Sequence, residues 1–87
     1  MARVGDVVRY IGDKYKPELR SHREEEYAEM GLQVGDIGVV VKPRGLRHTD
    51  LLAVRCFNNP YPPQYSDRGY WVLHTYEIQL ERGDDTQ

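Results

Sequence analysis

Aromatic and proline side chains gather in the last third of the chain, and their chemistry is that of recognition rather than of bond making. The cluster consists of Phe57, Pro60, Tyr61, Pro62, Pro63, Tyr65, Tyr70 and Trp71. Tyrosine and tryptophan combine a large rigid surface with one polar group, a combination that is common at binding hot spots. The candidate contacts for a protein partner are Phe57, Tyr61, Tyr65, Tyr70 and Trp71.

The adjacent pair Tyr70 and Trp71 leaves two interpretations of this cluster open. Successive side chains of a strand point to opposite faces, so we expect at most one of the two in the core and the other in need of cover. A bound partner is one source of that cover, and the prolines and tyrosines of the loop itself are the other. If the cluster is a binding face, Trp71→Ala and Tyr65→Ala should stay folded and lose the partner.

A basic loop after the central strand is the second candidate site. Lys42, Arg44 and Arg47 place three positive charges on one loop of an acidic protein, and Arg55 follows on the next strand. Such side chains would contact the phosphates of RNA or DNA. A plain solvated loop is the favoured interpretation, because no base-stacking aromatic residue is interleaved with these charges. An acidic helix near position 25 supplies the opposite pole, which could steer docking to a complementary protein.

The sequence predicts no catalysis. Cys56 falls at an inward strand position, where a lone cysteine behaves as a small hydrophobic residue. The histidines at 22, 48 and 74 lie in separate segments, without a Ser, Cys or Asp at a recognisable spacing. His22 and Glu26 lie four residues apart on a predicted helix, but two ligands without a third make a surface pair rather than a metal site. We expect no catalytic residue, metal ion, cofactor or small-molecule substrate.

Composition sets the broad class of the protein. The 87 residues are 39% hydrophobic and 30% charged, which is typical of one small globular domain. We assign the domain to residues 1–82 and expect a disordered tail at 83–87. The net charge of −2 and a pI near 5.9 argue against bulk nucleic-acid affinity. The single cysteine, and the absence of a membrane span or a signal peptide, favour a reducing, cytoplasmic location without membrane contact.

Two Gly-Asp pairs introduce the first two predicted strands. At positions 35–36, glycine reaches positive φ freely and aspartate bonds its own backbone, so the pair predicts a turn. The β-branched residues at 37–42 then predict the central strand. The pair at positions 5–6 repeats this arrangement ahead of the first strand, within residues 1–11.

The remaining strands are short and separated by turns, which predicts an all-β fold. In the first strand we expect Val8 and Tyr10 inward, because Arg9 would otherwise be buried without a partner. Further strands are expected at 51–57, 70–73 and 77–80, with Leu52, Val54, Cys56, Ile78 and Leu80 inward and a bridging turn at 74–76.

A helical insertion at about 13–33 separates the first two strands. Ser21 and Glu24 fit a capping box at a helix start, and the glutamates of the first turn suit the helix dipole. Gly31 is a natural stop for the helix. Tyr27 and Met30 fall on one stripe and should pack on the barrel, so we interpret the insertion as a lid over one open end.

Four separated motifs in the predicted strands resemble small SH3-like barrels. They are the Gly-Asp-led first strand, Gly-Asp-x-Gly-x-Val at 35–40, Val-x-x-aromatic at 54–57 and Tyr-Trp-Val…Glu-Ile-x-Leu at 70–80. The chain is most similar to the short SH3-fold proteins common in bacteriophage and bacterial genomes. The 35–40 block is also similar to the KOW element of ribosomal and transcription-elongation proteins. The architecture further resembles the SH3-like accessory subunits of photosynthetic electron-transfer complexes. The Ala-Leu-Tyr-Asp-Tyr opening of signalling SH3 domains is absent.

The resemblance implies a five-stranded SH3-like barrel with a short helix between strands one and two. Together with the aromatic cluster it indicates a non-enzymatic protein-interaction module, an accessory protein of a phage or bacterium that binds a host or assembly partner. The alternative is a KOW-like nucleic-acid or ribonucleoprotein contact through Lys42, Arg44, Arg47 and Arg55. A third interpretation is a structural subunit of a larger complex. A phage-encoded protein would act in the host cytoplasm.

Overall fold

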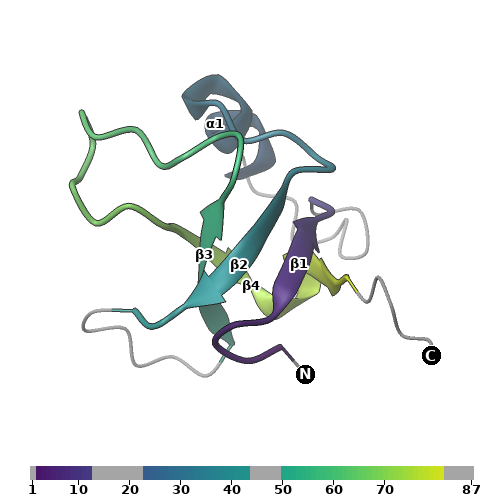
Figure 1. Cartoon of the computed structure of the whole chain (residues 1–87). Helices are drawn as coiled ribbons and strands as arrows, with labels where there is room; N and C mark the ends of the chain where they lie inside the picture. The colour runs from purple at the N-terminus through teal and green to yellow at the C-terminus, as the bar shows by residue number, and fades with distance from the viewer. Residues whose placement is uncertain (1, 13–22, 44–49, 82–87) are drawn as a thin grey trace.

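The computed structural model describes residues 2–12, 23–43 and 50–81, and within these ranges the protein is mostly β (Figure 1). Five antiparallel strands form one sheet that curls into a half-barrel, which confirms the predicted all-β class. The elements in chain order are β1 (Val7–Tyr10), α1 (Arg23–Met30), β2 (Ile37–Val41), β3 (Leu51–Cys56), β4 (Trp71–His74), the 3₁₀ helix η2 (Thr75–Glu77) and β5 (Ile78–Leu80). In the same ranges no helix has the length and apolarity that crossing a bilayer requires.

The strand order is β4-β3-β2-β1-β5, so the first and last strands of the chain are neighbours. The consecutive strands β2, β3 and β4 form a meander, and β1 lies between β2 and β5. In the register, Val8 is opposite Gly38 on one side and Leu80 on the other. The five predicted strands are confirmed, with boundaries that differ by about one residue from those expected.

The two Gly-Asp turns, at residues 3–6 and 33–36, have the same hydrogen-bonded structure. In the first turn, the backbone N–H of Asp6 donates to the carbonyl of Arg3 over 2.9 Å, and the Asp6 carboxylate accepts from the Arg3 N–H, also over 2.9 Å. The second turn repeats both bonds at 3.0 and 2.8 Å. The glycine has a φ of +98° in the first turn and +102° in the second, which a residue with a Cβ rarely adopts.

Because each turn leads into one of two paired strands, β1 and β2 are related by an approximate local two-fold axis. The axis passes between Val8 and Gly38, which face each other in the register. The N–H of the glycine in each turn donates to the opposite strand, at the carbonyls of Val40 and Tyr10, both over 2.8 Å. Each turn therefore fixes one end of the β1–β2 ladder.

The helix α1 has the predicted acidic first turn, and it ends where the sequence indicates. Gly31 has a φ of +115°. Its N–H donates to the carbonyl of Ala28 over 3.1 Å, and the N–H of Leu32 donates to that of Tyr27 over 2.8 Å. This pair of bonds is the Schellman motif, which satisfies the last carbonyls of a helix. The predicted cap at Ser21 and the rest of segment 13–22 lie outside the described residues.

The helix packs on the sheet through the two side chains that the sequence predicts, Tyr27 and Met30. The Tyr27 hydroxyl also donates to the carbonyl of Val72 in β4 over 3.0 Å. Because β4 is an edge strand, its outward backbone groups would otherwise be open to pairing with another chain. The helix therefore covers part of this edge.

The core lies on the concave side of the sheet. Its buried members are Val8, Tyr10, Leu32, Val40, Val54, Cys56, Trp71 and Leu73. Val8 and Tyr10 point inward as expected, whereas Leu52, Ile78 and Leu80 are only half-buried and pack at its margin.

Tyr70 and Trp71 are both buried, but only Trp71 belongs to the core cluster, and Tyr70 is covered by its own loop, which is one of the two interpretations that the sequence left open. Trp71 is 0% exposed and Tyr70 is 7% exposed. Strand alternation does not apply to this pair, because β4 begins at Trp71 and Tyr70 belongs to the preceding loop. That loop supplies the cover for Tyr70, since the guanidinium of Arg68 lies 5.2 Å from the centre of its ring.

The strands β2 and β3 approach each other closely at Gly38. A Cβ atom added there would lie 2.5 Å from the carbonyl oxygen of Arg55 and 2.9 Å from the Cα atom of Cys56. Both neighbours are backbone atoms of a paired strand and cannot move aside freely. The second glycine of the Gly-Asp-x-Gly motif is therefore required by strand packing rather than by a turn.

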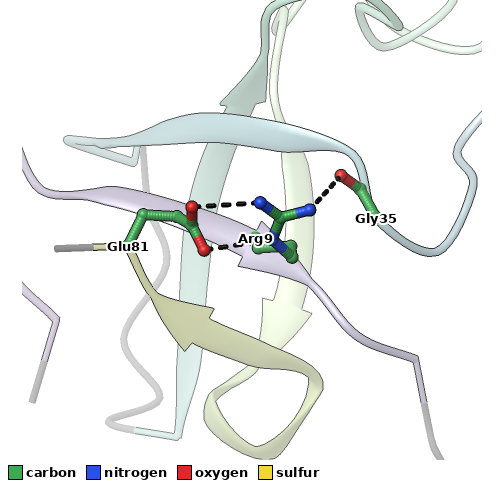
Figure 2. Close-up of polar contacts among 3 residues, drawn as sticks. All are labelled: Arg9, Gly35 and Glu81. Carbon is green, nitrogen blue, oxygen red and sulfur yellow. Dashed lines mark hydrogen bonds and ion pairs between the residues drawn. The ribbon is translucent and has the colours of Figure 1, made fainter. Parts of the chain in front are cut away.

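An ion pair joins β1 to the end of β5 (Figure 2). Nε of Arg9 lies 3.0 Å from Oε2 of Glu81, and Nη2 lies 3.1 Å from Oε1, so the contact is bidentate. Nη1 also donates to the carbonyl of Gly35 over 3.4 Å. The hydrogen bond from Arg9 lowers the pKa of the Glu81 carboxyl below its usual range. Arg9 thus connects the second Gly-Asp turn to the residue that follows β5.

Candidate functional site

The aromatic loop, residues 57–70, connects β3 to β4 and protrudes from the sheet (Figure 1). Its aromatic side chains divide into an exposed pair and a buried group. Phe57 is 58% exposed and Tyr65 is 57% exposed, whereas Tyr61 is half-buried and Tyr70 is buried with its neighbour Trp71. Only Phe57 and Tyr65 are therefore placed for extensive direct contact with a partner.

Tyr61 is the centre of the loop's own packing. Its ring lies edge-on to Trp71 with 5.0 Å between the centroids, and it contacts Tyr65 at 6.4 Å. Tyr27 of α1 lies on Trp71 at the same distance of 5.0 Å, also edge-on. Such edge-to-face contacts stabilise aromatic pairs beyond the burial of their area. Self-packing therefore describes the base of the loop, whereas Phe57 and Tyr65 remain exposed, as a binding face requires.

Arg68 completes this packing, and the sequence analysis did not identify it. Its guanidinium carbon lies 4.3 Å from the centre of the Tyr61 ring, in addition to its contact with Tyr70. Its Nε donates to the carbonyl of Tyr70 over 2.9 Å, and its backbone N–H donates to the Ser66 hydroxyl over 3.2 Å. An arginine within a run of tyrosines is the signal that could have found it, since guanidinium groups stack on aromatic rings.

A relay of hydrogen bonds anchors the loop to the second Gly-Asp turn. The side-chain amide of Asn59 donates to the Asp36 carboxylate over 2.6 Å, and the Trp71 indole N–H donates to the Asn59 carbonyl over 2.8 Å. The N–H of Phe57 also donates to the carbonyl of Ile37 over 3.0 Å. Because Phe57 and Asn59 are held in this way, the loop presents its rings from a rigid base.

The basic candidate site is described only in part. Lys42 and Arg55 are exposed, while Arg44 and Arg47 lie outside the described residues. Arg55 is opposite Val39 in the β2–β3 register, and it shares the outer face of the sheet with the start of the aromatic loop. Of the four predicted cations, the structure therefore describes only Lys42 and Arg55.

Two of the groups that could do chemistry, Cys56 and His74, lie in the described part of the chain, and both are packed against neighbouring residues. Cys56 is buried, and its pKa is raised to about 12 by burial and by the nearby Asp36 carboxylate, so the thiol stays protonated. His74 stacks on Tyr76 with 4.9 Å between the ring centres. His22 and His48 lie outside the described residues. Within residues 2–12, 23–43 and 50–81, no three His, Cys, Asp or Glu side chains come together as metal ligands.

The sheet also has a cleft whose lining residues lie outside the aromatic loop. This cleft of about 210 Å³ is lined by Ala2, Leu52, Thr75, Ile78 and Leu80. No lining residue carries a charged or titratable side chain. Its apolar residues Leu52, Ile78 and Leu80 pack against the core, so the cleft lies at the margin of the core.

Comparison of the chain with protein-family models, with curated proteins and with solved structures finds no match. The site is therefore interpreted from its own geometry.

Proposed function

We propose that the protein is a non-catalytic module that binds another protein through the aromatic loop. Phe57 and Tyr65 make the direct contacts, while Tyr61, Tyr70 and Trp71 support them from beneath. The observation that carries this proposal is the exposure of two large rings on a loop whose base is fixed by the Asp36–Asn59–Trp71 relay. Exposed aromatic residues on a rigid support are typical of hot spots.

A rigid support favours binding, because ordering flexible groups on association costs free energy. The prolines at 60, 62 and 63 restrict the backbone of the loop, and the Tyr65 N–H donates to the Pro62 carbonyl over 3.1 Å. Burial of one large apolar side chain contributes roughly 1.5–3 kcal/mol. Two such rings on a preorganised loop can therefore supply a useful share of the affinity for a protein partner.

We also infer that the half-barrel is a small SH3-like barrel, as the sequence motifs indicate. The topology supports this assignment, because the two edge strands of the curled sheet, β4 and β5, are joined by the three-residue η2 and are therefore close together at that end. The resemblance to short SH3-fold proteins of phages and bacteria then suggests an accessory protein as the setting. A lone buried cysteine fits the reducing cytoplasm expected for it.

The test is a capture experiment with matched variants. Tagged wild-type protein, Phe57→Ala and Tyr65→Ala are incubated with bacterial lysate, either untreated or treated with nuclease, and retained proteins are identified by mass spectrometry. We expect a discrete partner that is lost with both variants and retained with Val4→Ala. Val4 is a suitable control because it is 63% exposed on the first Gly-Asp turn. A partner that all variants retain would contradict the proposal.

The nucleic-acid alternative is favoured by one observation, the exposure of Lys42 and Arg55. A contact dominated by phosphates weakens steeply between about 50 and 200 mM salt, whereas an aromatic contact does not. Recovery of material that is sensitive to nuclease and salt, and that Phe57→Ala retains, would therefore move the function to these cations and to Arg44 and Arg47.

A permanent subunit of a larger complex would use the same face. Size-exclusion chromatography of the isolated protein over a range of dilutions separates this case from reversible binding. A reversible module should be folded and monodisperse alone, whereas an obligate subunit should self-associate or unfold.

A further inference from the structure

Arg68 is held in a fixed orientation at the surface of the aromatic loop. Its guanidinium lies over the Tyr61 ring at 4.3 Å and near the Tyr70 ring at 5.2 Å, while its Nε donates to the Tyr70 carbonyl. An arginine normally loses side-chain freedom when it binds a partner. Here the stacking has already restricted that freedom, so the cost of ordering this side chain on binding is small.

The hydrogen-bonding capacity of Arg68 is only partly used. The guanidinium has five N–H donors, and one of them, on Nε, has a hydrogen-bond partner. Within the described part of the chain neither terminal nitrogen has a hydrogen bond, and the ion pair of this part joins Arg9 to Glu81 instead. The neighbouring carboxylate of Asp67 does not pair with it. The loop therefore presents an oriented cation without a counter-charge.

We propose that Arg68 receives a carboxylate from the protein partner, so that the aromatic loop recognises an aspartate or glutamate flanked by an apolar residue. The planar guanidinium suits carboxylates, because two parallel N–H groups can bind both oxygens. The apolar neighbour would lie on the exposed ring of Tyr65, which is linked to the cation through Tyr61. This inference rests on the function proposed above.

A peptide carboxylate fits this surface better than a nucleic-acid phosphate. The protein has a net charge of −2, and α1 carries an acidic first turn. Both features repel a polyanion, whereas a single carboxylate beside an apolar residue needs only one local cation and one ring.

The test uses a random peptide library displayed on phage and selected on the wild-type protein. We expect enrichment of Asp or Glu next to an apolar residue. The best selected peptide is then measured by isothermal titration calorimetry. Replacing its acidic residue by the matching amide should weaken binding roughly tenfold, because a charged hydrogen bond becomes a neutral one. This arm requires no change in the protein, so it does not depend on whether a variant folds.

The protein arm compares three variants with the same peptide. Arg68→Gln should weaken binding roughly tenfold, and Arg68→Lys should recover only part of the loss, since lysine keeps the charge without the bidentate geometry. Arg3→Gln is the matched control, because Arg3 is an exposed arginine on the first Gly-Asp turn. Near-ultraviolet circular dichroism of Trp71 verifies that each variant is folded.

Three outcomes would overturn the proposal, and they separate it from the function on which it rests. Selected peptides that need Phe57 and Tyr65 but contain no acidic residue would disprove the role of Arg68 and leave the binding function intact. An affinity that is unchanged by Arg68→Gln would do the same. Binding of a mixed-sequence single-stranded oligonucleotide that is lost in Arg68→Gln would assign the cation to phosphate. Failure of the function itself would instead appear as no selected peptide and no partner that depends on Phe57 or Tyr65.

Discussion

The two Gly-Asp turns have the same local structure and different surroundings. In both, the aspartate closes the turn with its backbone and its carboxylate, and the preceding glycine has a left-handed φ. The carboxylate of Asp6 has only this local bond to Arg3 in the described part of the chain. The carboxylate of Asp36 also accepts from Asn59, which in turn accepts from the indole of Trp71.

This difference separates what local sequence determines, the turn itself, from what tertiary context determines, the further contacts of its aspartate. A Gly-Asp pair is enough to specify the turn, because the bonds that form it lie within four residues. It does not specify whether the aspartate also accepts a hydrogen bond from a distant residue. Only the second turn lies beside the aromatic loop, so only there does the same residue connect a turn, a loop and the core.

The largest effect on stability is expected at Trp71, the end of the relay that lies in the core. Trp71→Ala should lower the free energy of unfolding by about 3–5 kcal/mol, because it removes a fully buried ring and the donor to Asn59. That is a large share of the stability of a small domain. Urea unfolding followed by far-ultraviolet circular dichroism measures it. A folded variant of normal stability would show that neither the buried ring nor its hydrogen bond to Asn59 contributes to the stability of the fold.

The next effect tests how far the two-fold relation between the turns extends. The relation matches Gly38 of β2 to Val8 of β1, where a side chain is accommodated. Gly38→Ala should nevertheless cost roughly 1–3 kcal/mol, because the added Cβ meets the backbone of Arg55. The matched control is Val8→Ala, measured in the same way. This substitution creates a cavity rather than a clash, so a side chain larger than alanine at position 8 should restore stability. Position 38 should worsen with every larger residue, and an unchanged midpoint for Gly38→Ala would contradict the close approach.

The turns themselves should differ in the same direction. Asp36→Ala removes the turn bond and the bond to Asn59, whereas Asp6→Ala removes only the turn bond. At about 0.5–1.5 kcal/mol for each hydrogen bond, Asp36→Ala should be the more destabilising variant by about 1 kcal/mol. Equal losses in urea unfolding would mean that the relay through Asn59 contributes nothing, and that the two turns are equivalent in energy as well as in shape.

The smallest effect concerns the ion pair that reaches the second turn, and it depends on pH. Arg9 lowers the pKa of Glu81 in the folded protein. The pair therefore stabilises the fold above the unfolded pKa of Glu81, and this contribution is lost as pH falls through the lowered folded value. The stability difference between wild type and Glu81→Gln should be small at neutral pH and should vanish in acid. Added salt should reduce it as well. A difference that grows in acid would contradict this assignment.

The sequence predicts the elements of this fold better than their tertiary connections. Turn chemistry, the glycine stop of α1 and the alternation of Val8 and Tyr10 are signals within a few residues, and each is confirmed. The burial of Tyr70 was not predictable in this way, because it depends on Arg68 lying over its ring. Asn59 and Arg68 were missed for the same reason. Their roles arise from contacts between segments, which local spacing does not encode.

The strand order also bears on the sequence of events during folding. The meander β2-β3-β4 closes short loops, whereas β1 meets β5 only when Val8 reaches Leu80 near the other end of the chain. Long closures cost more chain entropy, so the meander should form in the transition state and β5 should join late. Substitutions such as Leu80→Ala would then accelerate unfolding without slowing folding. Asp36, Asn59 and Trp71 all lie within or beside the meander. A chain emerging from the ribosome would thus assemble its aromatic loop before its first and last strands meet.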